Sequence, residues 1–145
     1  MKKSIISIFF ALIGIFIVIL CELFIPAFRE LFRNSTLFLL PFIIFSLLGL
    51  ALIILTVKEK TETRAKKFLL LTGASAVGFF VFIFLHNAFY ALTVITQHIA
   101  VLSYLMGVFH AAFFIIALFV CPLGFLVGIV GSIVFLFKKA PNSSQ

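Results

Sequence analysis

Charged side chains are scarce in this 145-residue chain, and tryptophan is missing from it altogether. Only 10% of the residues are charged, whereas a soluble domain carries about 25%. The remaining sequence is 65% hydrophobic and holds 22 phenylalanines, so a water-soluble fold would have no polar surface with which to cover them. Lipid can solvate this composition, and the sequence therefore predicts an integral membrane protein.

The chain has only four acidic residues, which argues against most hydrolytic and phosphoryl-transfer enzymes. Of the four, Glu59 and Glu62 lie in a basic segment, and no paired carboxylates, Ser/His/Asp arrangement or phosphate-binding glycine loop is present. We therefore predict no catalytic and no cofactor-binding residue. The net charge of +7 does not indicate a nucleic-acid partner, because no basic face is interleaved with stacking aromatic residues outside the apolar segments.

The hydrophilic run 58–67 (KEKTETRAKK) divides the chain near its middle. On either side lie apolar segments long enough to cross a membrane, since about 20 helical residues suffice for the hydrocarbon core. The prediction is an all-α, polytopic transmembrane four-helix bundle that forms a single domain over residues 1–145. Its spans are expected at about 4–24, 37–57, 68–92 and 104–137.

The first apolar segment could also be a signal peptide, because a basic start precedes Ile5–Leu20. No A-x-A-like cleavage site follows it. A lipoprotein signal would need a small residue before Cys21, and Leu20 is not small. We therefore expect the segment to be retained as the first span, followed by a short amphipathic piece over residues 26–36 that lies in the interface.

The last apolar stretch, 99–137, is about twice as long as one span requires. Two spans joined by a turn at residues 121–124 would fit this length. They would, however, place Lys138 and Lys139 on the side opposite to the other basic segments, so one long, tilted or kinked helix is preferred. Pro122 removes a backbone hydrogen bond and, with Gly124 nearby, is the predicted hinge position, although a static kink that shapes the bundle is the favoured explanation.

The basic residues predict the orientation of the four spans. Nine of the eleven would lie on one side of the membrane and two on the other if the chain crosses four times. By the positive-inside rule both termini and the central loop are then cytoplasmic. The short first loop and basic start suit the plasma membrane of a prokaryote. The nine are Lys2, Lys3, Lys58, Lys60, Arg64, Lys66, Lys67, Lys138 and Lys139, and the other two are Arg29 and Arg33.

Small residues recur four apart in the third and fourth spans, a spacing that lets a neighbouring backbone approach closely. The simplest use is packing between the helices of one molecule, and dimerisation through the same faces is the alternative. The predicted packing residues are Gly73, Ala74, Gly78, Gly124, Gly128 and Gly131.

Ionisable residues inside the spans are candidates for function, because they are costly in lipid. Counted from the basic anchors, Cys21, His86 and Cys121 lie roughly 25–29 Å from the inner boundary, and Glu22 is one residue further out. Thiol, imidazole and carboxylate are ligands for zinc, copper or iron, so these four residues form a hypothetical metal site. Buried apolar cysteines, a Cys21–Cys121 disulfide, or pairing of Glu22 with a nearby arginine are the alternatives.

Haem held between His86 and His110 is a further alternative. The same count places His110 about 42 Å from the inner boundary, at or beyond the outer interface, so the two imidazoles are expected at different depths. Glu22 with the histidines could also support proton-coupled transport, although no inverted repeat is visible.

Two stretches, Phe68–Leu92 and Cys121–Ser132, carry Thr-Gly-Ala-Ser, His-Asn and Cys-Pro features. There the chain resembles small, uncharacterised four-span membrane proteins of prokaryotes. The resemblance covers roughly the C-terminal half and implies a four-span fold without a known activity.

The functional expectation is an accessory or structural membrane protein that acts through helix–helix contacts and is not itself an enzyme. Its expected partners are the lipid bilayer and a second copy or another membrane protein, with no cofactor unless the hypothetical metal site is real. The alternative is a metal- or proton-linked transport or redox protein that uses the outer Cys/His/Glu layer.

Overall fold

The computed structural model describes residues 3–32, 36–59 and 63–138, and these ranges contain helices and no strand. A π-helical segment, η2, joins α5 to α6 without a break in the helix. The elements in chain order are α1 (Lys3–Phe24), α2 (Pro26–Phe32), the 3-10 helix η1 (Thr36–Leu39), α3 (Leu40–Lys58), α4 (Thr63–Ile95), α5 (Ala100–Ile115), η2 (Ile116–Val120) and α6 (Cys121–Lys138).

Four helical rods are long and apolar enough to cross a membrane: α1, α3, α4 and the continuous α5–η2–α6. The predicted all-α, four-helix membrane fold is thereby confirmed. The helices run further than the predicted spans. Helix α4 begins at Thr63, inside the basic run, because lysine, arginine and alanine are good helix formers even where the chain leaves the apolar layer. The fourth rod begins at Ala100 rather than near residue 104.

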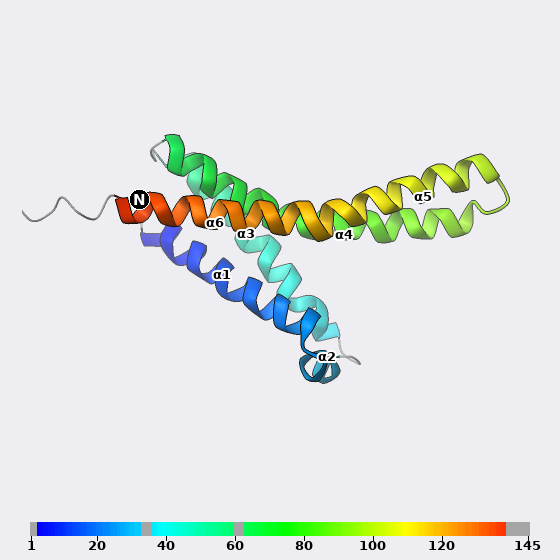
Figure 1. Ribbon diagram of the computed structural model, residues 1–145, viewed down its shortest axis with the longest axis horizontal. Coiled ribbons are helices and arrows are strands. Elements are labelled where there is room, and N and C mark those ends of the chain that lie inside the picture. Colours follow the sequence, from blue (N-terminus) through cyan, green and yellow to red (C-terminus); the bar gives the residue numbers. More distant parts are fainter. Residues whose placement is uncertain (1–2, 33–35, 60–62, 139–145) are drawn as a thin grey trace, which may run out of the picture.

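Neighbouring helices pack in chain order: α1 on α3, α3 on α4, and α4 on both α5 and α6. At one end of the molecule all four rods lie close together, and towards the other end the pair α1/α3 diverges from the pair α4/α5 (Figure 1). We call residues 84–115 the outer arm. The α4–α5 hairpin to which it belongs extends beyond α1 and α3 (Figure 1).

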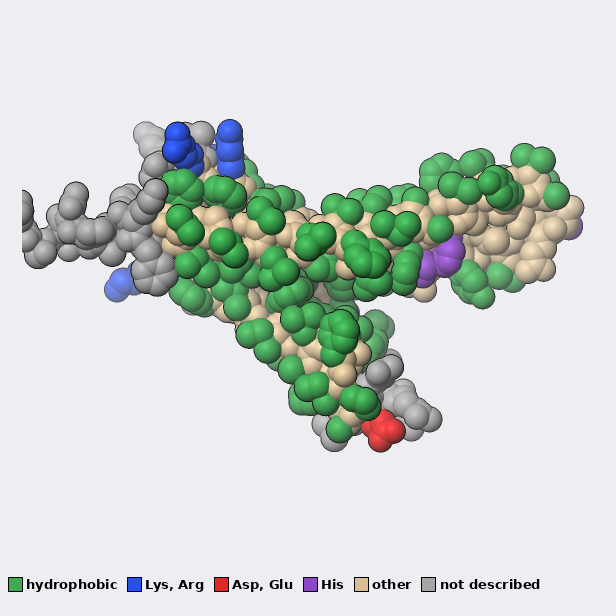
Figure 2. Space-filling model, in the orientation of Figure 1, with side chains coloured by type: hydrophobic (Ala, Val, Ile, Leu, Met, Phe, Trp, Pro, Cys, Tyr) green, Lys and Arg blue, Asp and Glu red, His purple; other side chains and the backbone are tan. Residues whose placement is uncertain are grey.

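The start of α1, the end of α3, the start of α4 and the end of α6 all lie at the closed end of the molecule (Figure 1). The lysine and arginine side chains that Figure 2 shows gather at that same end. The opposite end holds α2 on one limb and the uncharged α4–α5 turn on the other.

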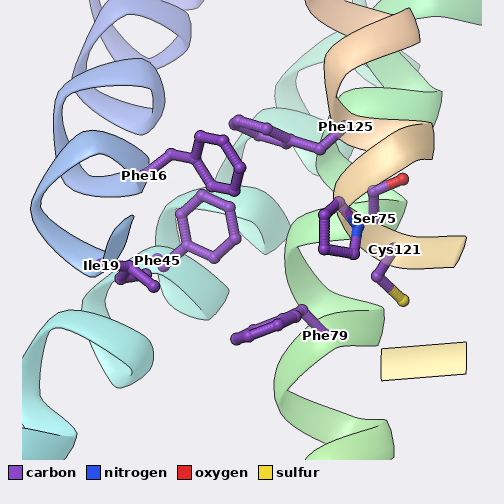
Figure 3. Close-up of a pocket in the computed structure, with 8 residues that line it drawn as sticks. Phe16, Ile19, Phe45, Ser75, Phe79, Cys121 and Phe125 are labelled. Atoms are coloured by element: carbon purple, nitrogen blue, oxygen red, sulfur yellow. The ribbon is translucent and has the colours of Figure 1, made fainter. Parts of the chain in front are cut away.

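Aromatic side chains join the two helix pairs in the middle of the bundle. The ring of Phe125 on α6 lies 4.7 Å from that of Phe16 on α1 and 5.0 Å from that of Phe45 on α3, centroid to centroid. Phe79 on α4 contacts Phe45 from the other side (Figure 3). The cavity of about 10 Å³ beside them would hold roughly one water molecule, so this part of the interior is close-packed.

Glycines form the contact between α4 and α6. A Cβ atom at Gly124 would lie 2.6 Å from Oγ of Ser75, and one at Gly128 would lie 2.8 Å from the backbone nitrogen of Thr72. A Cβ at Gly131 would overlap the ring of Phe68. Only glycine therefore permits this approach, in the manner of small-residue interfaces in membranes.

A second glycine contact joins α3 to α4. A Cβ at Gly49 would lie 2.9 Å from the carbonyl oxygen of Gly73, and one at Gly73 would lie 2.8 Å from the carbonyl oxygen of Gly49. A Cβ at Gly78 would meet the sulfur of Cys121 at 3.3 Å. Ala74, the remaining member of the predicted packing set, is exposed on the outside of α4.

The widened turn η2 immediately precedes Pro122. Proline cannot donate to the carbonyl four residues earlier, and its ring crowds that carbonyl. The backbone N–H of Cys121 donates instead to the carbonyl of Ile116, five residues back. The helix thus continues through residues 121–124 with a local π-helical distortion, and no turn separates it into two spans.

Candidate functional site

A cleft opens where the two helix pairs diverge, among the residues that the structure describes. Its volume is about 330 Å³, within the range typical of ligand pockets. We call it the outer cleft. Apolar and aromatic side chains form most of its wall, and His86 and Asn87 are its polar members. The lining residues are Leu23, Phe38, Leu39, Phe42, Phe79, Phe80, Ile83, His86, Asn87, Phe114, Ala117 and Leu118.

At the edge of the cleft, His86 of α4 and His110 of α5 stack face to face. Their ring centroids are 4.0 Å apart and the ring planes differ by 22°. Each ring also binds the other residue's backbone: Nδ1 of His86 lies 3.1 Å from the carbonyl oxygen of His110, and Nδ1 of His110 lies 3.1 Å from that of His86. The rings of Phe114 and Tyr90 flank the pair. We call these two residues the histidine pair.

The reciprocal hydrogen bonds determine the tautomer of both rings. A carbonyl oxygen can only accept, so Nδ1 of each ring must carry the proton and donate it. In a neutral imidazole the lone pair then resides on Nε2. The pair therefore presents two Nε2 acceptors, and none of the described residues donates to either of them.

The prediction that His86 and His110 lie at different depths was wrong. It assumed that Lys67 and Lys138 mark the same level, whereas Gly131 lies against Phe68, so that Lys138 extends further along the axis than Lys67. Between the Gly78–Cys121 contact and the histidine pair, the α5–η2–α6 rod also uses more residues than α4 does. The wide turn η2 lies in this stretch and takes up part of the excess.

The stacked geometry does not suit a metal chelate. A metal ion binds about 2.0–2.1 Å from Nε2, in the plane of the ring. Two stacked rings whose centroids are 4.0 Å apart and whose planes differ by 22° cannot both direct Nε2 in-plane at one ion at that distance. Haem requires imidazoles on opposite faces of the porphyrin, and rings in contact with each other leave no space for it.

The four residues of the hypothetical metal site lie on three helices. Among the described residues, no three His, Cys, Asp or Glu side chains come close enough to hold a metal ion. Cys121 lies buried at the start of α6 beside Ser75 (Figure 3), and Cys21 is half-buried on α1; both are free thiols. His86 pairs with His110 rather than with either thiol.

Glu22 is the unusual member of the set. Its side chain is only 1% exposed, and within the described part of the chain neither carboxyl oxygen has a hydrogen-bond partner. Leaving a buried polar group without a partner costs about 1–3 kcal/mol, and more for a charged group. The hydroxyls of Thr56 and Ser132 are buried in the same unpartnered way.

Sequence reasoning missed the packing role of Gly49 and the pairing of His110 with His86. Gly49 stood alone in its span with no small residue four positions away, so no motif marked it. His110 was not expected to meet His86, because the residue count placed the two at different depths in the membrane. A signal for the histidine pair did exist, since His86 and His110 are each 12 residues from His98 in the uncharged turn, as expected for facing positions in an antiparallel hairpin.

No protein-family description, no curated protein and no solved structure matches this chain.

Proposed function

We propose that this chain is a multi-pass protein of a prokaryotic plasma membrane with both termini in the cytoplasm, and that it is an accessory protein that binds another membrane protein through helix–helix contacts. The clustering of described basic side chains at the closed end supports the orientation. The outer arm is the proposed binding element.

The observation that carries the proposal is that α5 has no buried residue, although it is an apolar helix of 16 residues. Its neighbours are α4 and η2, and its outer face is left uncovered. Val101 is 81% exposed and Tyr104 is 77% exposed, and Val108 continues the same face one turn further. A span that served only as scaffold would bury a stripe against the bundle, as α1 and α3 do.

The surface of α5 also suits close approach by another helix. A Cβ atom at Gly107 would meet nothing within 4 Å, and Ala111 and Ala112 are exposed one turn further on. Small residues allow backbones to approach and gain dispersion contacts, which drive association where lipid is as apolar as the side chains.

The tyrosines place the outer arm relative to the bilayer. Tyrosine is enriched at the membrane interface, and Tyr90 and Tyr104 lie on the two facing helices of the arm, on either side of the turn. From Phe68, where the apolar part of α4 begins, Tyr90 is about 33 Å along the helix, close to the thickness of the hydrocarbon core of about 30 Å. The proposed partner would therefore meet α5 in the outer leaflet and at its surface.

Site-specific crosslinking in native membranes tests the proposal. In a chain whose two cysteines are replaced by alanine, Val108→Cys would be treated with a membrane-permeant bismaleimide and isolated through a C-terminal tag. The expected result is one discrete crosslinked species, whose mass shows whether the partner is a different protein or a second copy. Val130→Cys, on the exposed side of α6, is the matched control and should give none. Equal crosslinking at both positions, or none at either, contradicts the proposal.

Proton-linked transport is the second candidate, and the burial of Glu22 without a described partner favours it. Membrane-embedded carboxylates commonly mark proton pathways. Proteoliposomes loaded with a pH-sensitive dye would show proton entry that Glu22→Gln abolishes. Absence of proton entry in the parent protein, under either sign of membrane potential, would remove this candidate.

A further inference from the structure

Two neighbouring concavities adjoin the histidine pair, and we call them together the groove. A second concavity of about 340 Å³ lies over the pair and is lined by His86, His110, Ala111, Phe114 and Ile115. It shares His86 and Phe114 with the outer cleft. The groove thus has a polar end at the two imidazoles and an apolar end between the helix pairs.

The polar end is rich in acceptors. Nδ1 of each ring donates to a backbone carbonyl, so that in the neutral form of the imidazole the acceptor is Nε2. Asn87 uses one amide N–H to donate to the carbonyl of Ile83 at 2.9 Å, which leaves its carbonyl oxygen free. An acceptor in a lipid environment is unfavourable unless something donates to it. The groove therefore matches a ligand that brings a hydrogen-bond donor.

The apolar end of the groove determines which chemical groups the remainder of the ligand can carry. Phe42, Phe79 and Phe80 line it together with aliphatic side chains. None of the lining residues described for either concavity is lysine or arginine, so a phosphate group would find no cation and would face lone pairs instead. Charged headgroups are thus disfavoured, and a neutral polar end is favoured.

The depth of the pair agrees with such a ligand. His86 lies about 27 Å along α4 from Phe68, near the outer edge of the hydrocarbon core. Hydroxyl groups of neutral lipids lie at this level when their hydrocarbon chains extend towards the membrane centre, which is the direction of Phe79 and Phe42.

We propose that the groove is a binding site for a neutral lipid with a free hydroxyl group. The hydroxyl donates a hydrogen bond to Nε2 of His86, and the hydrocarbon chain occupies the outer cleft between α3 and α4. This site shares only Ala111 with the α5 surface proposed above for the protein partner, and Val101, Tyr104 and Val108 do not line it. The lipid and crosslinking experiments therefore test the two proposals independently.

A matched pair of lipids tests the hydrogen bond directly. The full-length protein would be titrated with 1,2-dioleoylglycerol, which has a free hydroxyl, and with its 3-acetyl ester, which has none, and bound lipid would be counted by native mass spectrometry. One hydrogen bond corresponds to about two- to tenfold tighter binding of the free alcohol. Equal affinities for the free alcohol and its acetyl ester would overturn the proposal.

Imidazole nitrogen NMR locates the contact. In protein labelled with [¹⁵N]histidine, diacylglycerol should shift the Nε2 resonances of the histidine pair and leave that of His98, at the tip of the arm, unchanged. His86→Phe keeps an aromatic ring but removes the acceptor, and should reduce the preference between the two lipids to about onefold, whereas His98→Phe should retain it. A preference that survives His86→Phe contradicts the assignment. If His86→Phe does not fold, the proposal is tested by the affinities of the parent protein for the two lipids and by its Nε2 chemical shifts.

Discussion

Gly128 on α6 lies directly against Thr72 on α4, so that a Cβ atom at Gly128 would be 2.8 Å from the Thr72 backbone nitrogen and 3.1 Å from the carbonyl oxygen of Phe68. Both of these groups belong to the backbone and cannot rotate away. The contact therefore depends on the absence of a side chain at position 128.

Replacing Gly128 by leucine should lower the stability of the bundle by about 1–3 kcal/mol or more, because overpacking forces the helices apart. Thermal unfolding in mild detergent would measure it. Gly107→Ala is the matched control: nothing lies within 4 Å of its Cβ, and alanine is the better helix former by about 1 kcal/mol, so stability should rise slightly. Equal melting temperatures for Gly128→Leu and the parent would refute the packing role.

The histidine pair should behave as one energetic unit. Replacing either histidine by alanine removes the ring stack and one of the two reciprocal hydrogen bonds, with an expected cost of about 1–2 kcal/mol each. Because each change also weakens the other residue's contacts, the double variant should be less destabilised than the two singles combined, with a coupling of about 1 kcal/mol. Strict additivity in the double-mutant cycle would show that the two rings do not interact.

We expect the buried carboxyl group of Glu22 to lower the free energy of unfolding. Glu22→Gln keeps the shape but removes the carboxyl group that is buried without a described partner, and we expect unchanged or higher stability, by up to about 1–2 kcal/mol. The control is Glu30→Gln on α2, where the side chain is exposed and no change is expected. A large loss of stability for Glu22→Gln alone would show that the carboxylate binds a group, such as a cation, in the membrane.

The orientation can be tested with single cysteines in a chain without its native thiols. Gln97→Cys, in the exposed turn of the outer arm, should react with a membrane-impermeant maleimide added to intact cells. Lys58→Cys, exposed at the closed end, should react only after the membrane is opened. The reverse pattern would invert the topology and place the histidine pair near the cytoplasmic face.

Sequence reasoning predicted the membrane class and the four helices because each rests on a local property. About twenty consecutive apolar residues suffice to identify a span whatever its neighbours do. The glycines of α6 were predicted for a similar reason, since their spacing of four along one helix is visible in the chain. Gly49 shows the limit: its contact with Gly73 joins two helices, and although Gly73 was predicted as a packing residue, no small residue four positions away marks Gly49.

Depth along the membrane was less predictable than helix identity. Counting residues from lysine anchors assumes that the anchors are level and that each residue contributes the same rise. Here α6 extends past the level of Lys67, and the π-helical turn before Pro122 changes the register of α5 against α4. Only the packed hairpin shows that His86 faces His110.

Composition and spacing by themselves determined that this chain is helical and has four segments long and apolar enough to cross a lipid bilayer, because solvation of apolar segments is a local free energy. The tertiary structure alone decided which residues meet: the stacked imidazoles, the buried carboxyl of Glu22 and the cleft between the diverging helix pairs. These features depend on the relative rotation and register of helices, which result from many weak packing contacts summed across the whole molecule.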